Sequence, residues 1–234
     1  MEGLVNDVTH LVKFVLLGDI GVGKSSIMNR FMNNEFDKNI SPSLGSEFHT
    51  HTFTCSRSFK VQFWDTAGGL KHANNRQIYY LGASIFFIVY DMCDSRALKQ
   101  VLNLLEEIRW KKDEELNAFS TEFKANAMVC LVANKSDMKH MRQISEADGV
   151  EFAQEHNLHY FEMSAKTGQD VKASFEAALL AFDAMDADNR KTGGTGLTHI
   201  LDYPPSEDFE YESSENDVWI EYNGRRNKCC CILL

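Results

Sequence analysis

The chain has 234 residues, 44% of them hydrophobic and 11% aromatic, which suits one α/β domain with a tail or at most two small domains. Its formal net charge of −10 argues against nucleic acid as a partner, because neutralising phosphates requires a basic face. No apolar run reaches the roughly 20 residues of a membrane-spanning helix, and we expect no signal peptide at the N-terminus.

The first predicted elements are a strand over residues 11–17, a glycine-rich loop over 18–25 and the start of a helix over 26–31. In this order, the backbone N–H groups of the loop and of the first helical turn point at bound phosphates. The Lys24 ammonium reaches the terminal phosphates, and the Ser25 hydroxyl ligates Mg²⁺. A chance glycine-rich turn does not explain eight matching positions in this context. The residues expected to contact the nucleotide here are Gly18, Gly21, Val22, Gly23, Lys24, Ser25 and Ser26.

Further along the chain, strands alternate with helices, which predicts an α/β fold with a parallel sheet covered by helices on both faces. A hairpin of two strands comes first, and continuous apolar runs typical of strands buried on both faces follow it. In such sheets, ligands bind beyond the carboxyl ends of the strands. The predicted strands cover residues 48–55, 59–64, 85–90, 127–133 and 160–163, and the predicted helices cover 98–108, a stretch that begins after Ser145, and 171–182.

Asp65 ends the second strand of the hairpin, at the same sheet edge as the phosphate loop. An aspartate at this place in a phosphate-loop protein holds the metal ion, usually through water, so Asp65 joins Ser25 as a candidate Mg²⁺ residue. The turn that follows it brings the backbone N–H of Gly68 toward the γ-phosphate.

Two later segments at strand ends carry the residues expected to recognise the base. After the strand over 127–133, the Asp137 carboxylate accepts hydrogen bonds from N1–H and the exocyclic amine of guanine, a pair of donors that adenine lacks. Asn134 fixes this loop, and the stem of Lys135 packs over the base. After the strand over 160–163, the segment Ser164, Ala165 and Lys166 offers the Ala165 N–H to the guanine O6 atom.

Together these motifs resemble the Ras superfamily of small GTPases, and the Rab branch in particular, over roughly residues 8–185. The Rab-like segments are WDTAG at 64–68, YYLGA at 79–83, IVYD at 88–91 and an altered switch I segment, LGSEF, at 44–48. The resemblance implies a P-loop NTPase small G domain, whose six-stranded, mostly parallel sheet has helices on both faces and one antiparallel edge strand. It also implies GTP or GDP as the ligand and Mg²⁺ as the cofactor.

Further roles follow only from this resemblance. Phe36 is expected to pack its edge on the guanine, and Ser43 stands where the family has a threonine that senses the γ-phosphate and Mg²⁺. Phe48, Trp64 and Tyr79 match the aromatic triad on which Rab effectors dock. The implied partners are an exchange factor, an activating protein, effectors, a prenyltransferase and a GDI-like chaperone, all acting on a monomer.

The chain also departs from the family pattern. Gly69 stands in place of the glutamine that orients the attacking water, and the bulky Ile20 replaces a small residue of the phosphate loop. We therefore expect Lys24, Gly68 and Gly69 to support only slow hydrolysis and a bias toward the GTP-bound state. Residues 70–73 replace the usual charged switch II residues, and 113–126 is interpreted as a surface insertion.

From residue 186 to 234 the composition becomes acidic, with flexible glycines and a pair of prolines, and we expect a disordered tail. Aromatic residues among the acids suit either a docking peptide or an unstructured spacer. The chain ends Cys231-Ile232-Leu233-Leu234, which predicts a geranylgeranyl group on Cys231, and Cys230 or Cys229 offers a second lipid site. With three scattered cysteines expected to be reduced, this places the protein on the cytoplasmic face of an intracellular membrane, with a cytosolic pool.

Two functions remain open at this point. The first is a slowly hydrolysing GTPase switch in vesicle trafficking, and the second is a GTP-locked adaptor with negligible turnover that presents effectors on a membrane. A third candidate, an ATP-dependent nucleotide kinase, disagrees with the guanine-specific segment at 134–137.

Overall fold

The computed structural model describes residues 10–39, 47–54, 58–68, 79–80, 82–110, 127–191, 209–214, 217–222 and 225–229. Over these ranges, no helix is both long and apolar enough to cross a membrane. The insertion expected over residues 113–126 lies outside them.

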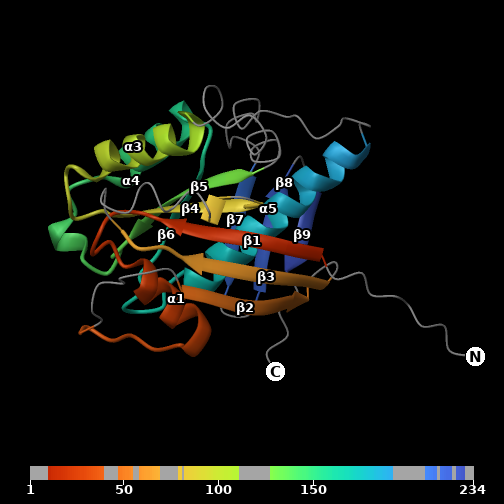
Figure 1. The fold of residues 1–234 in the computed structure, drawn as a ribbon, viewed down its shortest axis with the longest axis horizontal. Coiled ribbons are helices and arrows are strands. Elements are labelled where there is room, and N and C mark those ends of the chain that lie inside the picture. The colour runs from red at the N-terminus through yellow and green to blue at the C-terminus, as the bar shows by residue number, and fades with distance from the viewer. Residues whose placement is uncertain are drawn as a thin grey trace, which may run out of the picture.

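A six-stranded sheet forms the centre of the molecule, and its strand order is β2-β3-β1-β4-β5-β6 (Figure 1). All neighbouring strands run parallel except the β2–β3 hairpin, which places the antiparallel strand β2 at one edge. The predicted α/β fold with its single antiparallel edge strand is therefore confirmed. The strands are β1 (His10–Leu17), β2 (Glu47–Thr54), β3 (Ser58–Asp65), β4 (Ile85–Asp91), β5 (Met128–Asn134) and β6 (His159–Glu162).

In the described part of the chain, four helices and a short 3₁₀ turn pack around this sheet. They are α1 (Lys24–Asn33), α3 (Ala97–Trp110), η2 (Lys139–Met141), α4 (Glu146–Glu155) and α5 (Val171–Lys191). Helices α1 and α5 share one buried cluster with the sheet, and α3 and α4 share the other, so both faces are covered. Because successive strand residues point to opposite faces, Phe14 and Leu16 of β1 join the first cluster while Val15 and Leu17 join the second. This explains the continuous apolar runs in the sequence.

Helix α4 begins with a complete capping box. The Ser145 hydroxyl accepts a hydrogen bond from the Asp148 N–H (3.0 Å), and the Asp148 carboxylate accepts one from the Ser145 N–H (3.1 Å). This arrangement satisfies two backbone donors that a helix start would otherwise leave unpaired, and it confirms the predicted cap at Ser145.

Replacing Gly149 in α4 by alanine is expected to lower the free energy of unfolding by about 1–3 kcal/mol. In most helices this change is favourable, but here a Cβ atom would lie 2.6 Å from the Tyr160 hydroxyl oxygen. Tyr160 cannot move freely, because its hydroxyl donates to Glu162 (2.7 Å). Urea unfolding measures the effect, and in a Tyr160→Phe background the penalty should shrink. A stabilised Gly149→Ala variant would show that this packing is not restrictive.

The C-terminal region contains the end of the last helix and three further strands. Helix α5 continues to Lys191, and the backbone forms a second antiparallel sheet of β7 (Phe209–Ser214), β8 (Asp217–Tyr222) and β9 (Arg225–Cys229). The sequence Phe209-Glu210-Tyr211-Glu212 alternates aromatic and acidic residues, a period of two that is typical of strands.

Candidate functional site

The phosphate loop connects the end of β1 to the start of α1 and closes against two neighbouring strands. A Cβ atom at Gly18 would lie 2.3 Å from the Val89 carbonyl oxygen, and one at Gly23 would lie 2.4 Å from Asn134 Nδ2. Gly23 also has a φ of 97°, in the left-handed region that glycine adopts without strain. Glycine at these positions allows the backbone to approach the ends of β4 and β5.

Lys24 is buried, with only 6% of its surface exposed, at the start of α1. Its ammonium donates to the carbonyl oxygens of Gly18 (3.1 Å) and Asp19 (2.9 Å), so the charge lies across the loop that precedes it. A buried cation with these partners can neutralise the charge of phosphate groups bound by the loop. Val22 is buried, and Ser26 is half-buried in the first turn of α1.

Ser25 and Asp65, predicted as metal residues from separate segments, are in contact. The Ser25 hydroxyl donates to Asp65 Oδ2, and Oδ1 of the same carboxylate is buried without a hydrogen-bond partner among the described residues. Burial raises the pKa of Asp65, which a nearby cation would counteract. Mg²⁺ prefers hard oxygen ligands of this kind, so the pair fits the implied ion. The third predicted metal residue, Ser43, lies outside the described residues.

Gly68 packs directly on the phosphate loop. A Cβ atom there would lie 2.8 Å from the backbone of Asp19 and of Ile20, so only glycine fits this approach. The Ile20 side chain is 62% exposed, and Gly69 lies outside the described residues. The phosphate loop has a further contact that the sequence did not reveal. Gln100 of α3 donates a hydrogen bond to Asp19 Oδ2 (2.8 Å).

Asn134, at the end of β5, connects the phosphate loop to the segment after β6. Its side-chain Nδ2 donates to the Val22 carbonyl oxygen (2.8 Å), and its Oδ1 accepts a hydrogen bond from the Ala165 N–H (3.1 Å). The amide is buried, so both bonds are shielded from water. The Ala165 N–H, expected to be available for guanine O6, is thus already paired with Asn134.

The Asp137 carboxylate is held by the segment that follows β6. Its Oδ1 accepts from the Ser164 hydroxyl (2.7 Å), and its Oδ2 lies 3.3 Å from the Lys166 ammonium. Burial alone would raise the pKa of Asp137, but these two hydrogen bonds outweigh it and lower the pKa below the ordinary value. The carboxylate is therefore ionised at neutral pH, as hydrogen bonding to two guanine donors requires.

Lys135 adopts a left-handed backbone conformation with a φ of 71°, and its ammonium donates to Asp91 Oδ2 (2.6 Å). This ion pair ties the segment after β5 to the end of β4. Phe36, predicted to pack on the base, is partly buried against the cluster shared by α1 and α5.

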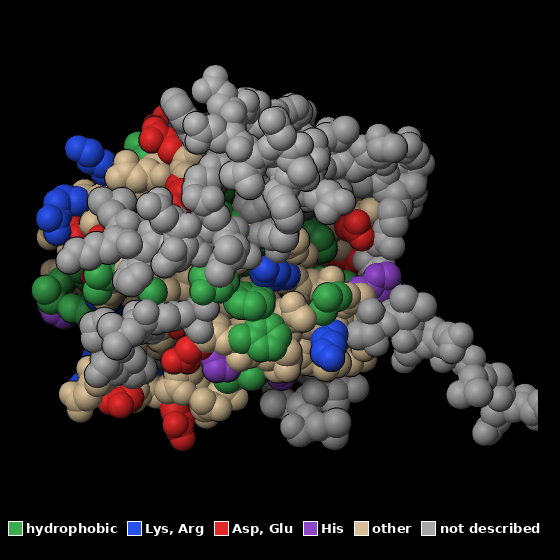
Figure 2. Space-filling view, viewed as in Figure 1, with side chains coloured by type: hydrophobic (Ala, Val, Ile, Leu, Met, Phe, Trp, Pro, Cys, Tyr) green, Lys and Arg blue, Asp and Glu red, His purple; other side chains and the backbone are tan. Residues whose placement is uncertain are grey.

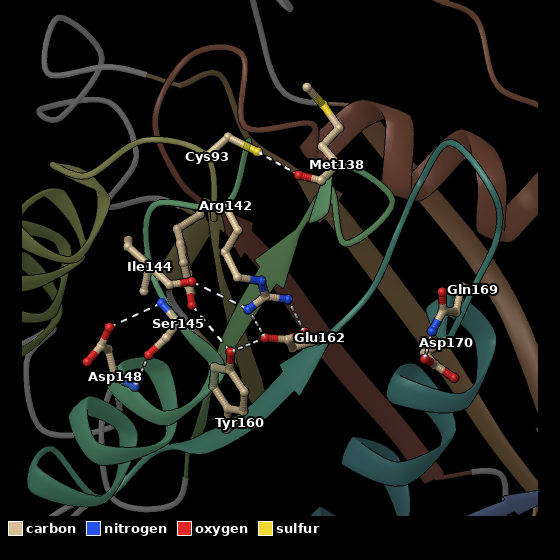
Figure 3. Close-up of polar contacts among 11 residues, drawn as sticks. Cys93, Met138, Arg142, Ile144, Ser145, Asp148, Tyr160, Glu162, Gln169 and Asp170 are labelled. Carbon is tan, nitrogen blue, oxygen red and sulfur yellow. Dashed lines mark hydrogen bonds and ion pairs between the residues drawn. The ribbon is translucent and has the colours of Figure 1, made fainter. Parts of the chain in front are cut away.

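A polar network that the sequence did not reveal joins Arg142, Tyr160 and Glu162 (Figure 3). Arg142 donates through both terminal nitrogens to the two carboxylate oxygens of Glu162, each at 2.8 Å, and Tyr160 donates to the same carboxylate. Paired guanidinium–carboxylate bonds fix direction as well as distance. Arg142 therefore anchors the segment after β5 to β6, which ends just before Ser164.

The predicted effector residues come together on the face formed by β2, β3 and β1. The Phe48 and Trp64 rings are 5.0 Å apart, the Trp64 and Tyr79 rings are 5.5 Å apart, and the Lys13 ammonium lies 4.7 Å from the Trp64 ring centre. Phe48 is 49% exposed. Figure 2 shows hydrophobic side chains gathered over these strands, with basic side chains at the margin. The three rings and the Lys13 ammonium thus form one aromatic cluster, of which Phe48 is the exposed member. Of the predicted lipid sites, Cys229 ends β9, and Cys230 and Cys231 lie outside the described residues.

Comparisons with known proteins agree with this geometry. The Ras family model matches residues 13–183. Ras-related protein Rab-11A of Dictyostelium discoideum is 34% identical over 82% of this chain and 86% of its own length. Ras-related protein RABA2c of Arabidopsis thaliana is 35% identical over 73% of this chain and 74% of its own. GTP-binding protein ypt3 of Schizosaccharomyces pombe is 35% identical over 73% and 75%, respectively.

Proposed function

The chain belongs to the Ras family as a Rab-like small GTPase, and we propose that it binds GTP with Mg²⁺, hydrolyses it slowly and acts as a membrane-anchored switch in vesicle trafficking. The observation that carries the proposal is the buried Asn134 side chain, which bonds both the phosphate loop and the segment after β6. One nucleotide can then bind its phosphates at Lys24 and its base at Asp137 within a single preorganised site.

The chain's own groups account for binding and for a slow reaction. Lys24 and the loop N–H groups neutralise charge on the phosphates, and Ser25 with Asp65 would hold the metal ion. When bound there, Mg²⁺ would neutralise negative charge on the phosphates. The Gly68 backbone packs against the phosphate loop, but Gly69 offers no side chain to orient water.

The GTP-locked adaptor is the second candidate function, and the exposed Ile20 at the phosphate loop together with Gly69 favours it. The nucleotide that co-purifies with the full chain distinguishes the two functions. Chromatography of the released nucleotide should detect mostly GDP for a cycling switch and mostly GTP for the adaptor. A released fraction that contains neither GDP nor GTP would contradict both functions.

Regulators and effectors of Rab type are the proposed protein partners, with effectors meeting the Phe48, Trp64 and Tyr79 surface in the GTP state. A prenyltransferase and a GDI-like chaperone would act on the C-terminus. The aromatic rings provide a large apolar contact area, and Lys13 adds a cation at its margin.

Replacing Cys231 by serine is expected to move most of the protein from the membrane fraction to the soluble fraction. A lipid contributes about 0.8 kcal/mol per buried CH₂, so its loss lowers membrane affinity by orders of magnitude. Fractionation of cells that express either form measures this, with the half-buried Cys93→Ser as a matched control. Unchanged membrane association of the Cys231→Ser variant would argue against a lipid on Cys231.

A further inference from the structure

We propose that Gln100 of α3 is a positioning residue for the γ-phosphate and so sets how strongly the site prefers GTP over GDP; this rests on the proposed GTP-binding function. The Gln100 side-chain nitrogen donates to Asp19 Oδ2 in the phosphate loop (2.8 Å), across 81 positions of the chain. A hydrogen bond to a carboxylate is stronger than one between neutral groups, and partial burial strengthens it further.

The Asp19 carboxylate controls one peptide unit of the loop, the one that joins Asp19 to Ile20. Its other oxygen, Oδ1, accepts a hydrogen bond from the Ile20 N–H (2.7 Å), which belongs to that unit. Among the residues that the structure describes, this N–H and Gln100 are the two donors to the carboxylate. Gln100 therefore fixes the carboxylate, and the carboxylate fixes the orientation of the peptide.

The same peptide touches both groups that are proposed to meet the γ-phosphate. Its carbonyl oxygen accepts a hydrogen bond from the Lys24 ammonium (2.9 Å). Gly68 packs on the peptide itself, since a Cβ atom at Gly68 would lie 2.8 Å from the Asp19 carbonyl group and from the Ile20 nitrogen. A tilt of this one peptide would displace the ammonium and the Gly68 backbone together.

The α- and β-phosphates depend on a different part of the loop. In a phosphate loop, the backbone N–H groups of the glycine-rich turn and of the helix start hold these two phosphates, whereas the lysine reaches the β- and γ-phosphates. In this chain those N–H groups follow Ile20, over residues 21–26. A change in the Asp19 peptide should therefore weaken the binding of GTP more than that of GDP.

Helix α3 presents Gln100 from a fixed position. Its neighbours on the helix, Ala97 and Val101, are each 1% exposed and belong to the buried cluster that α3 and α4 share with the sheet. The Gln100 backbone N–H donates to the Arg96 carbonyl oxygen (3.2 Å), and its side chain is half-buried. The donor is thus held in place by the core before any nucleotide binds.

The test measures equilibrium affinities of the full chain, with Mg²⁺ present, for GDP and for a GTP analogue whose β–γ bridge is an imido group and is not hydrolysed. Gln100→Met keeps the length of the side chain and removes the donor. The affinity for the GTP analogue should fall roughly fivefold to fiftyfold, because one hydrogen bond to a charged group is lost, and that for GDP less than about twofold. An equal fall for both nucleotides, or no fall, would overturn the assignment.

A double-mutant cycle shows whether Gln100 acts through Asp19. Asp19→Ala should reproduce the selective loss, and adding Gln100→Met to it should cause no further loss; a full second loss would overturn the proposal. Should Gln100→Met fail to fold, Gln100→Glu keeps the shape without the donor and must give the same selective loss.

Gln154→Met, the same change at an exposed position of α4, is the matched control. Both affinities should stay unchanged in this variant, and a selective loss of GTP binding there would overturn the assignment to Gln100. If wild type binds GDP and the analogue no better than ADP, the proposed function fails rather than this assignment.

Discussion

Replacing Asp137 by asparagine is expected to weaken GTP binding roughly 10²- to 10⁴-fold, because two charge-assisted hydrogen bonds of about 1.5–3 kcal/mol each are lost. The carboxylate is preorganised for this role: Ser164 and Lys166 hold both of its oxygens, and its pKa is lowered. An amide at this position donates a hydrogen bond, and xanthine carries a carbonyl oxygen where guanine carries the amine. The variant should therefore bind xanthosine triphosphate better than wild type does.

Competition against a fluorescent guanine nucleotide measures both affinities on the same preparation. Glu155→Gln, an exposed carboxylate-to-amide change on α4, is the matched control and should leave both affinities unchanged. If Asp137→Asn kept full GTP affinity, Asp137 would not be the group that selects guanine.

Replacing Gly69 by glutamine is expected to accelerate GTP hydrolysis, on the order of 10²-fold, because a side-chain amide would then orient the attacking water. Gly68, the neighbour of this position, packs on the phosphate loop at Asp19 and Ile20. Lys24 and the Ser25–Asp65 pair are in place without it, so wild type should retain slow turnover rather than none.

Single-turnover hydrolysis of preloaded GTP gives the rate without interference from product release. Gly69→Ala removes the glycine without supplying an amide, and it should stay as slow as wild type. Equal rates for wild type and Gly69→Gln would mean that water orientation at position 69 does not limit the reaction; Ile20, which is exposed at the loop, would then be the next residue to replace.

The fold and the main site segments could be predicted because local patterns determine them. The phosphate loop lies between a strand and a helix. Gly18 and Gly23 are required there, because a Cβ atom at either position would lie only 2.3–2.4 Å from an atom of β4 or β5. The antiparallel edge strand followed from a hairpin in the sequence. Ser145 caps α4 by pairing with Asp148, three positions away, which a sequence pattern can also reveal.

Contacts between distant segments could not be predicted in this way. Arg30 bonds residues about 135 positions further along the chain, and Gln100 reaches Asp19 from a helix whose pattern indicates only an apolar face. Arg142 and Glu162 form their pair only because η2 and β6 are brought together by the sheet. Pairing of Ala165 with Asn134 likewise depends on the relative position of two strand ends. Each depends on tertiary distance, on which composition and period carry no information.

The most direct test of the account is equilibrium binding of GTP and ATP, with Mg²⁺ present, to the purified full chain stripped of nucleotide. A site with a preorganised carboxylate at Asp137 should favour GTP by at least about 10³-fold, since adenine leaves that carboxylate without its two donors. Equal affinity for the two nucleotides would contradict the account.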